Sequence, residues 1–257
     1  MLEEIRQLEW TNHNIQLTPS DFTVSPEAKC IEEDPRVLAL KKHLPVFLKR
    51  DFRELMLLDL GCFEGGISLE MAKMGFQVLG IEGRRSNFVK AKLIERYFGM
   101  GNLRFVEADV KTLSKDMTGP LDIILCCGLL YHLDDPFSCL EKLFSLLNRP
   151  GMFFLDTHFA PLDSHLNACV FKNELSDRVT LAHEKGRYEG RWYNEDIDHE
   201  WAAVSNAKSF WPTHRDLVRA LYHVGFSSIY EVFGNIDIEE EYAVKERLSR
   251  TFFICLR

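Results

Sequence analysis

Residues 55–158 alternate between short apolar runs and segments with the apolar spacing of a helix, and no other feature constrains the fold as strongly. Short apolar runs are typical of strands buried on both faces, and the helical segments between them supply the crossovers that parallel strands need. We therefore expect an α/β fold with a doubly wound, mostly parallel sheet. The predicted strands are 55–60, 76–82, 103–109, 121–127 and 151–158, and the predicted helices are 67–75, 86–99 and 135–151.

A second regular region follows near the C-terminus. The segment 212–226 has helical spacing, with Pro212 in its first turn and Gly225 at its end, where helix termini favour these residues. The apolar runs 227–233 and 251–257 predict two further strands. The expected sheet therefore has seven strands.

Two segments lie outside this pattern. Residues 1–50 predict an N-terminal helical cap, interrupted by prolines, ahead of a main domain at 51–257. Residues 160–211 form an insertion after the fifth strand, with a hairpin predicted to turn at Lys185-Gly186. An insertion of this length in a compact domain is usually functional, so we expect a lid or a binding element.

Composition and charge argue against several classes of protein. The net charge of −8 and the pI near 5.6 argue against broad binding to nucleic acid or anionic membranes. Seven cysteines without a CxxC pair predict reduced thiols and not a zinc site. The first ten residues, MLEEIRQLEW, lack the pattern of a signal peptide, and no apolar stretch approaches the ~20 residues of a membrane span. These features predict a cytoplasmic protein.

The stretch LLDLGCFEGG, residues 57–66, predicts a strand that turns into a helix around a ligand. A dinucleotide fingerprint would place glycine at positions 61, 63 and 66, because the second glycine lets the backbone approach a pyrophosphate. This chain has Phe63 at the second position. A nucleoside ligand without phosphates is therefore favoured.

The same stretch resembles the first motif of class I S-adenosylmethionine-dependent methyltransferases, which have a Rossmann-like fold. Asp59, Gly61 and Gly65 match that motif, and Phe63 departs from it. The resemblance continues in order through VLGIEGR (78–84), VEADV (106–110) and LDIILCCGLLYHLDDPF (121–137). It implies S-adenosylmethionine as cofactor and a binding site made of Asp59, Gly61, Cys62, Phe63, Gly65, Glu82, Gly83, Asp109, Val110, Gly128 and Tyr131.

Individual roles follow from the resemblance. Glu82 ends the second strand, where the family's acidic residue holds both ribose hydroxyls. Asp109 occupies the position that contacts the adenine amine, although an aspartate after a strand also commonly caps the next helix. The loop around Tyr131 lines the methyl-transfer site in the family, and an aromatic ring there can hold a cationic sulfonium.

Methyl transfer from a sulfonium depends mainly on alignment, and a hydroxyl acceptor also needs a base. His132 and His158 follow two neighbouring predicted strands and are the candidate catalytic bases, with a structural role as the alternative for each. The run NEDIDHEW (194–201) could gather ligands for a divalent metal, but charge runs are usually solvated faces, so no metal site is assigned.

The favoured function is methyl transfer to a small-molecule acceptor, at oxygen in the first place, with nitrogen left open. The long insertion would build the acceptor pocket, and the oligomeric state stays open. One alternative is a tRNA methyltransferase acting on wobble uridine, because CGLLYHLDDP is similar to the fourth-motif loop of that group. Two others are an NAD-dependent oxidoreductase and a non-catalytic adenosyl-binding protein.

Overall fold

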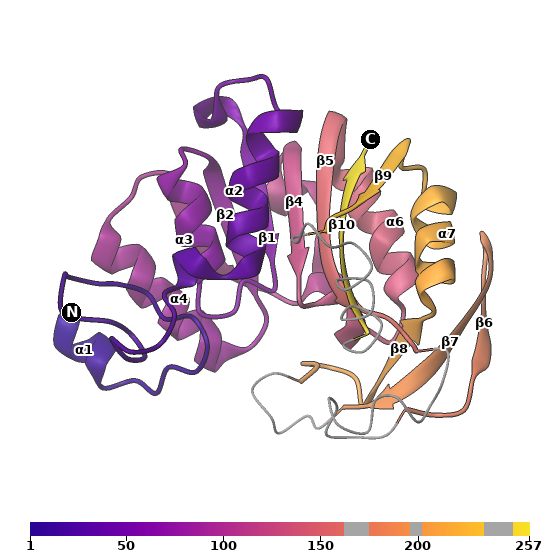
Figure 1. Ribbon diagram of the computed structural model, residues 1–257, viewed down its shortest axis with the longest axis horizontal. Coiled ribbons are helices and arrows are strands. Elements are labelled where there is room, and N and C mark those ends of the chain that lie inside the picture. The colour runs from indigo at the N-terminus through magenta and orange to yellow at the C-terminus, as the bar shows by residue number, and fades with distance from the viewer. Residues whose placement is uncertain (162–174, 196–201, 234–248) are drawn as a thin grey trace. The chain divides into compact units, whose positions relative to one another are not determined.

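The computed structural model describes residues 1–161, 175–195, 202–233 and 249–257, and it comprises two compact units, Met1–Ile123 and Ile124–Arg257 (Figure 1). Its helices are α1 (Leu2–Arg6), α2 (Pro35–Phe47), α3 (Gly66–Lys73), α4 (Arg85–Phe98), α5 (Lys115–Thr118), α6 (Pro136–Leu146) and α7 (His214–Val224). Its strands are β1 (Met56–Leu60), β2 (Gln77–Glu82), β3 (Leu103–Glu107), β4 (Leu121–Cys127), β5 (Leu147–His158), β6 (Val179–His183), β7 (Gly186–Asn194), β8 (Lys208–Pro212), β9 (Ser228–Glu231) and β10 (Arg250–Leu256).

Seven of these strands form one sheet in the order β3-β2-β1-β4-β5-β10-β9. β2 pairs in parallel with both β1 and β3, whereas β10 runs antiparallel between β5 and β9 (Figure 1). Every residue of β4 is buried, as expected for a strand with both faces covered. The prediction of an α/β fold with a mostly parallel, seven-stranded sheet is confirmed.

In the first unit, α3 and α4 pack against β2 and β3. The buried side of α4 carries Ala91, Leu93 and Ile94, which gives the helix one apolar face toward the core. Gly99 ends α4 in the left-handed conformation (φ +58°), as its position in the sequence indicated.

The N-terminal segment contains less helix than the sequence indicated. α1 and α2 are its α-helices, and residues 7–30 between them form irregular backbone with a single bridge between Gln16 and Phe22. The backbone of this stretch is held instead by side chains: Asn14 accepts from the N–H groups of Val24 and Ser25 through Oδ1.

Two predicted helix boundaries are wrong, and in each case a strand takes the residues. The helix predicted to end at Pro150-Gly151 ends at Leu146, and β5 begins at Leu147. Backbone packs closely there, since a Cβ on Gly151 would lie 2.5 Å from the carbonyl oxygen of Asn148.

At the second boundary, Pro212 is the last residue of β8 and does not lie in the first turn of α7. Its carbonyl accepts a hydrogen bond from Ala160 (2.8 Å), which fixes it as extended backbone. Thr213 is the N-cap, and its hydroxyl accepts from the N–H of Asp216 at 3.2 Å.

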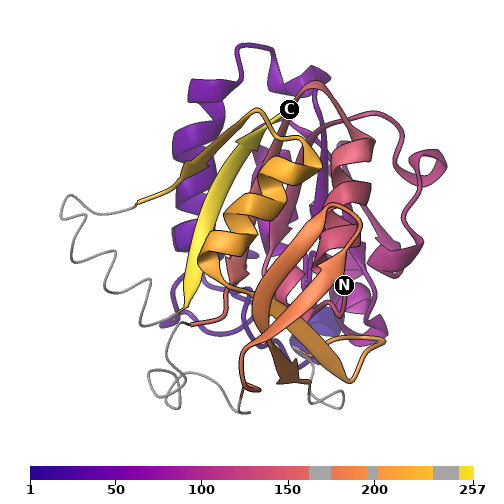
Figure 2. The same ribbon diagram turned by 90° about the vertical axis from the view of Figure 1, so that its right-hand side faces the viewer.

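The described part of the insertion is a three-stranded antiparallel sheet, β6-β7-β8, in the second unit (Figure 2). The predicted hairpin is present as β6 and β7, with His183 paired to Gly186 across a two-residue turn. The strand β8 was not predicted. Among the described residues, no helix combines the length and the apolar character that crossing a membrane requires.

Candidate active site

The turn after β1 uses backbone conformations that glycine favours. Gly61, Phe63 and Gly65 all have positive φ, at +68°, +53° and +84°. The N–H groups of Gly61 and Cys62 both donate to the carbonyl of Ile81, at 2.8 and 3.0 Å. The turn is therefore folded against β2, and Phe63 takes a left-handed conformation that is strained for a residue with a Cβ.

Glu82, at the end of β2, lies beside this turn. Its Oε2 accepts a hydrogen bond from the N–H of Phe63 (2.9 Å), and its Oε1 accepts from the N–H of Arg84 (2.7 Å). Burial raises the pKa of Glu82, and these two hydrogen bonds oppose that shift. The carboxylate is thus fixed in one orientation by backbone donors, and each oxygen has a further lone pair for a ligand hydroxyl.

Asp59, at the end of β1, points into the protein. It is 2% exposed, and its Oδ2 accepts from the hydroxyl of Ser68 at 2.5 Å. Burial raises the pKa of Asp59 to about 6. Cys62 is also buried, and burial raises the pKa of its thiol well above the usual range. Asp59 therefore joins β1 to α3, and Cys62 remains a neutral thiol within the turn.

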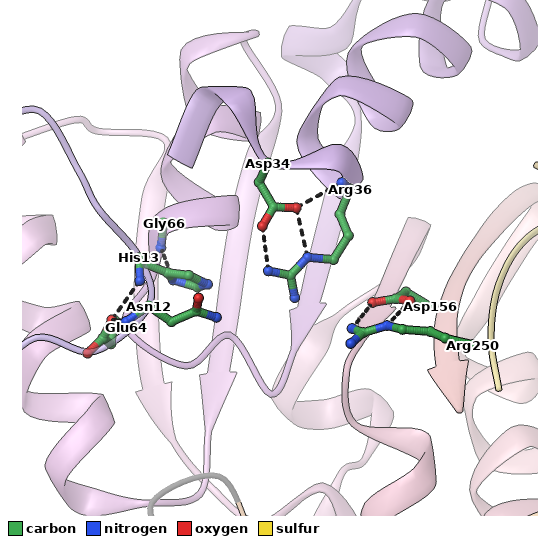
Figure 3. A network of polar contacts seen from close by, with 8 residues as sticks. All are labelled: Asn12, His13, Asp34, Arg36, Glu64, Gly66, Asp156 and Arg250. Atoms are coloured by element: carbon green, nitrogen blue, oxygen red, sulfur yellow. Dashed lines mark hydrogen bonds and ion pairs between the residues drawn. The ribbon is translucent and has the colours of Figure 1, made fainter. Parts of the chain in front are cut away.

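Glu64 anchors the N-terminal segment to the turn (Figure 3). Its fully buried carboxylate accepts from the backbone N–H groups of Thr11, Asn12 and His13 at 2.9–3.2 Å. It also binds the ammonium group of Lys90 at 2.8 Å. Burial raises the pKa of Glu64 and the hydrogen bond from Lys90 lowers it, with a net shift downward. Glu64 is therefore an ionised carboxylate whose partners come from a distant segment.

His13 occupies the N-terminus of α3. Its Nδ1 accepts a hydrogen bond at 2.9 Å from the N–H of Gly66, the first residue of that helix (Figure 3). Burial and the charge of Arg36 lower the pKa of His13 to about 4, which keeps the ring neutral. In dinucleotide-binding folds this helix end holds the pyrophosphate. In this protein the imidazole of His13 occupies the position of the pyrophosphate at this helix end.

Arg36, in the first turn of α2, forms a two-point ion pair with Asp34 (Figure 3). Its Nε and Nη2 atoms lie 2.9 and 2.7 Å from the two carboxylate oxygens. The positive charge of Arg36 adds to the lowering of the His13 pKa, and it opposes the larger upward shift that burial causes at Asp59. Arg36 and His13 were not predicted as site residues, because the N-terminal segment carries none of the methyltransferase motifs. Glu64 lies within the first motif but was not assigned a role, because its partners Thr11–His13 are distant in the sequence.

The remaining predicted cofactor residues of the first unit lie at the ends of β2 and β3. Asp109 caps the 3₁₀ turn that begins at Val110, and its Oδ1 accepts from the N–H of Lys111 at 2.9 Å. This is the capping role that the sequence left open as an alternative. Gly83, next to Glu82, and Val110 are both partly exposed.

In the second unit, Gly128 follows β4 with φ +87°, and its N–H donates to the carbonyl of Asp156 at 2.9 Å. Asp156 is fully buried and forms a two-point ion pair with Arg250 of β10, at 2.8 and 2.5 Å (Figure 3). This pair joins β5 to β10 at the residue whose carbonyl also binds Gly128.

Tyr131 and His158 belong to an aromatic cluster with Trp211. The His158 ring stacks on Trp211, with centroids 5.1 Å apart and planes 10° apart, and meets Tyr131 edge-on at 4.6 Å. The Nδ1 atom of His158 lies 3.0 Å from the carbonyl of Ser249, so it carries the proton in that bond. Burial, followed by the charge of Arg250, lowers the pKa of His158 to about 4.

His132 has a different environment. Its Nδ1 lies 3.1 Å from each carboxylate oxygen of Glu195, the residue that follows β7. Glu195 also accepts from the hydroxyl of Ser209 (2.7 Å) and from the N–H of Ala203 (3.0 Å). Burial raises the pKa of Glu195 and the hydrogen bond to His132 lowers it, with a net shift downward. Of the two candidate bases, His132 is therefore the one paired with a carboxylate.

The structure thus brings the predicted residues together in two groups. Gly61, Phe63 and Glu82 form one group in the first unit; Tyr131, His132 and His158 form the other in the second. In the ranges that the structure describes, no cluster of three or more His, Cys, Asp or Glu side chains could hold a metal ion. Most of the candidate ligand run at 194–201 lies outside those ranges, and Glu195 contacts His132.

Comparison with known sequences gives one family. A profile described as a methyltransferase domain matches residues 51–203, more than half of the chain. The ubiquinone biosynthesis O-methyltransferase of Psychrobacter cryohalolentis is 28% identical over 196 residues, which cover 75% of this chain and 72% of that protein. Its counterpart from Colwellia psychrerythraea is 29% identical over 128 residues, 49% of this chain and 51% of that protein. The chain therefore spans about half the length of the Colwellia relative.

Solved structures with the same fold include the N-terminal domain of EvdMO1, crystallised in the presence of S-adenosylhomocysteine and D-fucose. It has a TM-score of 0.67 and 22% identity, covering 99% of this chain and 92% of that one. The magnesium protoporphyrin IX methyltransferase of Synechocystis PCC 6803, with bound S-adenosylhomocysteine, has a TM-score of 0.55 and 16% identity. The match covers 88% of this chain and 84% of that one. At these identities the likeness establishes the fold.

A seven-stranded sheet in this order, with β10 antiparallel between β5 and β9, is the architecture of the class I S-adenosylmethionine-dependent methyltransferases. The chain belongs to the methyltransferase domain family. The sequence-based prediction of a methyltransferase with a Rossmann-like fold is confirmed.

Proposed function

We propose that this protein transfers the methyl group of S-adenosylmethionine to an oxygen atom of a small-molecule acceptor. The observation that carries the proposal is the position of Glu82 beside the turn at 61–66. A backbone N–H group donates to each of its oxygens, and each oxygen keeps a further lone pair that can accept from a ribose hydroxyl. A side chain fixed before the ligand arrives loses little entropy on binding.

Other residues of the first unit fit the remaining parts of the cofactor. Asp109, at the end of β3, would accept from the adenine amine through the carboxylate that caps the following turn. Arg36 would bind the carboxylate of the amino-acid tail, because a guanidinium pairs well with a carboxylate. When bound, the cofactor supplies a methyl group on a sulfonium, whose departure needs no acid; the chain contributes alignment and removal of the acceptor proton.

The pairing of His13 with Gly66 argues against an NAD-dependent oxidoreductase. A pyrophosphate needs the N–H groups at the start of the helix after β1. The first of these already donates to His13 Nδ1, so it is not available to a phosphate oxygen.

Oxygen is favoured as the acceptor atom because the curated relatives are named O-methyltransferases. Residues 160–211 remain a predicted cover for the acceptor site, and a cytoplasmic location also stays a prediction. The tRNA methyltransferase and the non-catalytic binding protein are alternatives that the experiments below separate.

Calorimetry tests the cofactor site. We expect the wild type to bind S-adenosylmethionine and S-adenosylhomocysteine but not NAD. Glu82→Gln should weaken S-adenosylhomocysteine binding by about 10–100-fold, since hydrogen bonds to a charged group contribute about 1.5–3 kcal/mol each. Glu107→Gln is the matched control, because Glu107 ends the neighbouring strand β3 and pairs with the exposed Arg85. Equal affinity in the two variants would overturn the Glu82 assignment.

A turnover screen with a labelled methyl donor tests the acceptor class. The acceptors should include phenols, sugars, amines and unmodified tRNA. We expect label in a hydroxyl-bearing small molecule. Label recovered in tRNA alone would favour the wobble-uridine alternative, and cofactor binding without turnover on any acceptor would favour a binding protein.

A further inference from the structure

His132 and Glu195 form a pair that is built like a catalytic dyad, and it lies within the second unit. The contact at 3.1 Å to both carboxylate oxygens requires a proton on Nδ1, since ionised Glu195 can only accept. In the neutral ring the lone pair is then on Nε2. We propose that His132 is the base that deprotonates the acceptor hydroxyl and that Glu195 is its positioning residue. This inference rests on the proposed function.

Glu195 is held in place independently of His132. Its side chain is 1% exposed, although it belongs to a segment rich in charge. The Ser209 hydroxyl donates to one oxygen and the Ala203 N–H to the other, so the carboxylate cannot turn away. A buried carboxylate in contact with a histidine is costly unless the pair has good geometry and further hydrogen bonds, and both conditions are met here.

The backbone around His132 is fixed as well. In the 3₁₀ turn Leu130–His132, the carbonyl of Tyr131 accepts from the indole N–H of Trp211 at 2.7 Å. The carbonyl of His132 accepts from the side-chain amide of Asn206 at 2.9 Å, and the next carbonyl, that of Leu133, accepts from the N–H of Phe210 at 2.9 Å. The small sheet therefore sets both the position of the turn and the orientation of the ring.

His158 is the less suitable base. Its Nδ1–H donates to a neutral carbonyl, which stabilises an imidazolium less than a carboxylate does. The positive charge of Arg250 also disfavours protonation of His158, and a base is most effective when its pKa lies near the working pH. Its ring packs flat on Trp211, which suits a wall of the acceptor site.

The proposed step balances in atoms and charge. The acceptor oxygen forms a bond to the methyl carbon while Nε2 of His132 takes the hydroxyl proton. The carbon–sulfur bond breaks with its electron pair remaining on sulfur, which becomes a neutral thioether. The positive charge moves from sulfur to the imidazolium of His132, where the Glu195 carboxylate stabilises it. No additional reactant is required.

In the described part of the chain, His132 interacts with titratable side chains from other elements. One is Glu195, and the other is His158, whose protonation the charge of His132 disfavours. Tyr131, beside His132 on the same turn, has its ring 4.2 Å from the imidazole. Glu195 is therefore the group among these that can carry a negative charge next to His132.

The test begins with a measurement that does not need the acceptor. In nitrogen-15 histidine spectra recorded with S-adenosylhomocysteine present, we expect neutral His132 to carry its proton on Nδ1. In Glu195→Gln the pH midpoint of His132 should fall by about one to three pH units, as loss of an adjacent opposite charge predicts. Glu184→Gln, on the exposed turn between β6 and β7, is the control and should leave the midpoint unchanged.

Turnover completes the test. His132→Ala should lower kcat by about 10²–10⁴-fold, while His158→Phe should lower it by less than tenfold. Glu195→Gln should lower kcat and move the acidic limb of the pH–rate profile to lower pH, without changing the KM for the methyl donor. Glu195→Asp, which restores the charge, should return the limb toward its wild-type position. A merely structural Glu195 would lower activity in both variants and leave the limb in place.

Two results would overturn the inference: a His132 midpoint that is the same in wild type and Glu195→Gln, or a His132→Ala enzyme that keeps wild-type kcat. Failure of the proposed function is a separate result, since it would appear as wild-type protein that does not bind S-adenosylmethionine. The spectra would still decide whether Glu195 controls His132 in that case.

Discussion

The imidazole of His13 accepts a hydrogen bond at Nδ1 from the N–H of Gly66, at 2.9 Å. This bond joins the irregular N-terminal segment to the first turn of the helix after β1. It gives the helix N-terminus an internal partner, so that the donor is satisfied without an anion. We therefore expect this hydrogen bond to stabilise the first unit against unfolding and to disfavour a pyrophosphate ligand at this helix end.

Gly66 should not tolerate a side chain. A Cβ there would lie 2.8 Å from Cγ1 of Ile31 and 2.9 Å from Cγ of His13. We expect Gly66→Ala to reduce the free energy of unfolding by about 1–3 kcal/mol, the usual cost of overpacking. Urea denaturation measures this. Gly101→Ala is the control, because a Cβ at Gly101 meets nothing within 4 Å, and equal loss in both variants would contradict the prediction.

The stability contribution of His13 should depend on pH. Its pKa is about 4 in the folded protein against an ordinary 6.5, so between these values only the unfolded chain binds the proton. The contribution is therefore complete above about pH 6.5 and is lost as the pH falls toward 4. His13→Asn keeps an acceptor near the position of Nδ1 but does not titrate. We expect the stability difference between wild type and variant to shrink by roughly 1–3 kcal/mol from pH 7 to pH 4. If the stability difference between wild type and His13→Asn were the same at pH 7 and pH 4, the prediction would be refuted.

Asp59 should show the opposite dependence. Its pKa is raised to about 6 from 3.8, so the folded protein binds a proton in this window and the unfolded chain does not. The carboxylate therefore reduces stability increasingly as the pH rises through the window, with the full effect above about pH 6. Asp59→Asn should be more stable than wild type at pH 8 by about 1–3 kcal/mol and equally stable near pH 4. The exposed Glu9→Gln variant should differ from wild type at neither pH, and a destabilised Asp59→Asn at pH 8 would count against the argument.

Phe63→Gly should not convert the site to NAD binding. The substitution restores the glycine of a dinucleotide fingerprint and removes a left-handed strain of about 1–2 kcal/mol. The Gly66 N–H still donates to His13, however, so it is not available to a phosphate oxygen. Calorimetry should therefore show no NAD binding, with binding of S-adenosylhomocysteine as the control. Measurable NAD affinity would show that Phe63 alone excludes dinucleotides.

Local sequence patterns were sufficient to predict the elements of the main sheet and the methyltransferase family. Alternating apolar runs placed β1, β2 and β4 to within one residue, because burial on both faces leaves a strong local pattern. The glycines after β1 and the acidic residue at the end of β2 are also local signals, and they carried the resemblance to the methyltransferases. The ends of α6 and α7 were misplaced, since a proline next to a helix is equally compatible with the strand that adjoins it.

The contacts between side chains at the candidate site could not be predicted in this way, because they depend on how distant segments fold together. The partners of His13, Glu64 and Glu195 come from segments 51–63 residues away, and no periodicity relates such positions. Glu195 in particular belongs to a charged run that resembles a solvated surface in the sequence. It becomes a buried carboxylate because β7, β8 and the turn at His132 pack around it. Its burial and its hydrogen bonds therefore depend on the packing of several segments, and no single segment of the sequence encodes them.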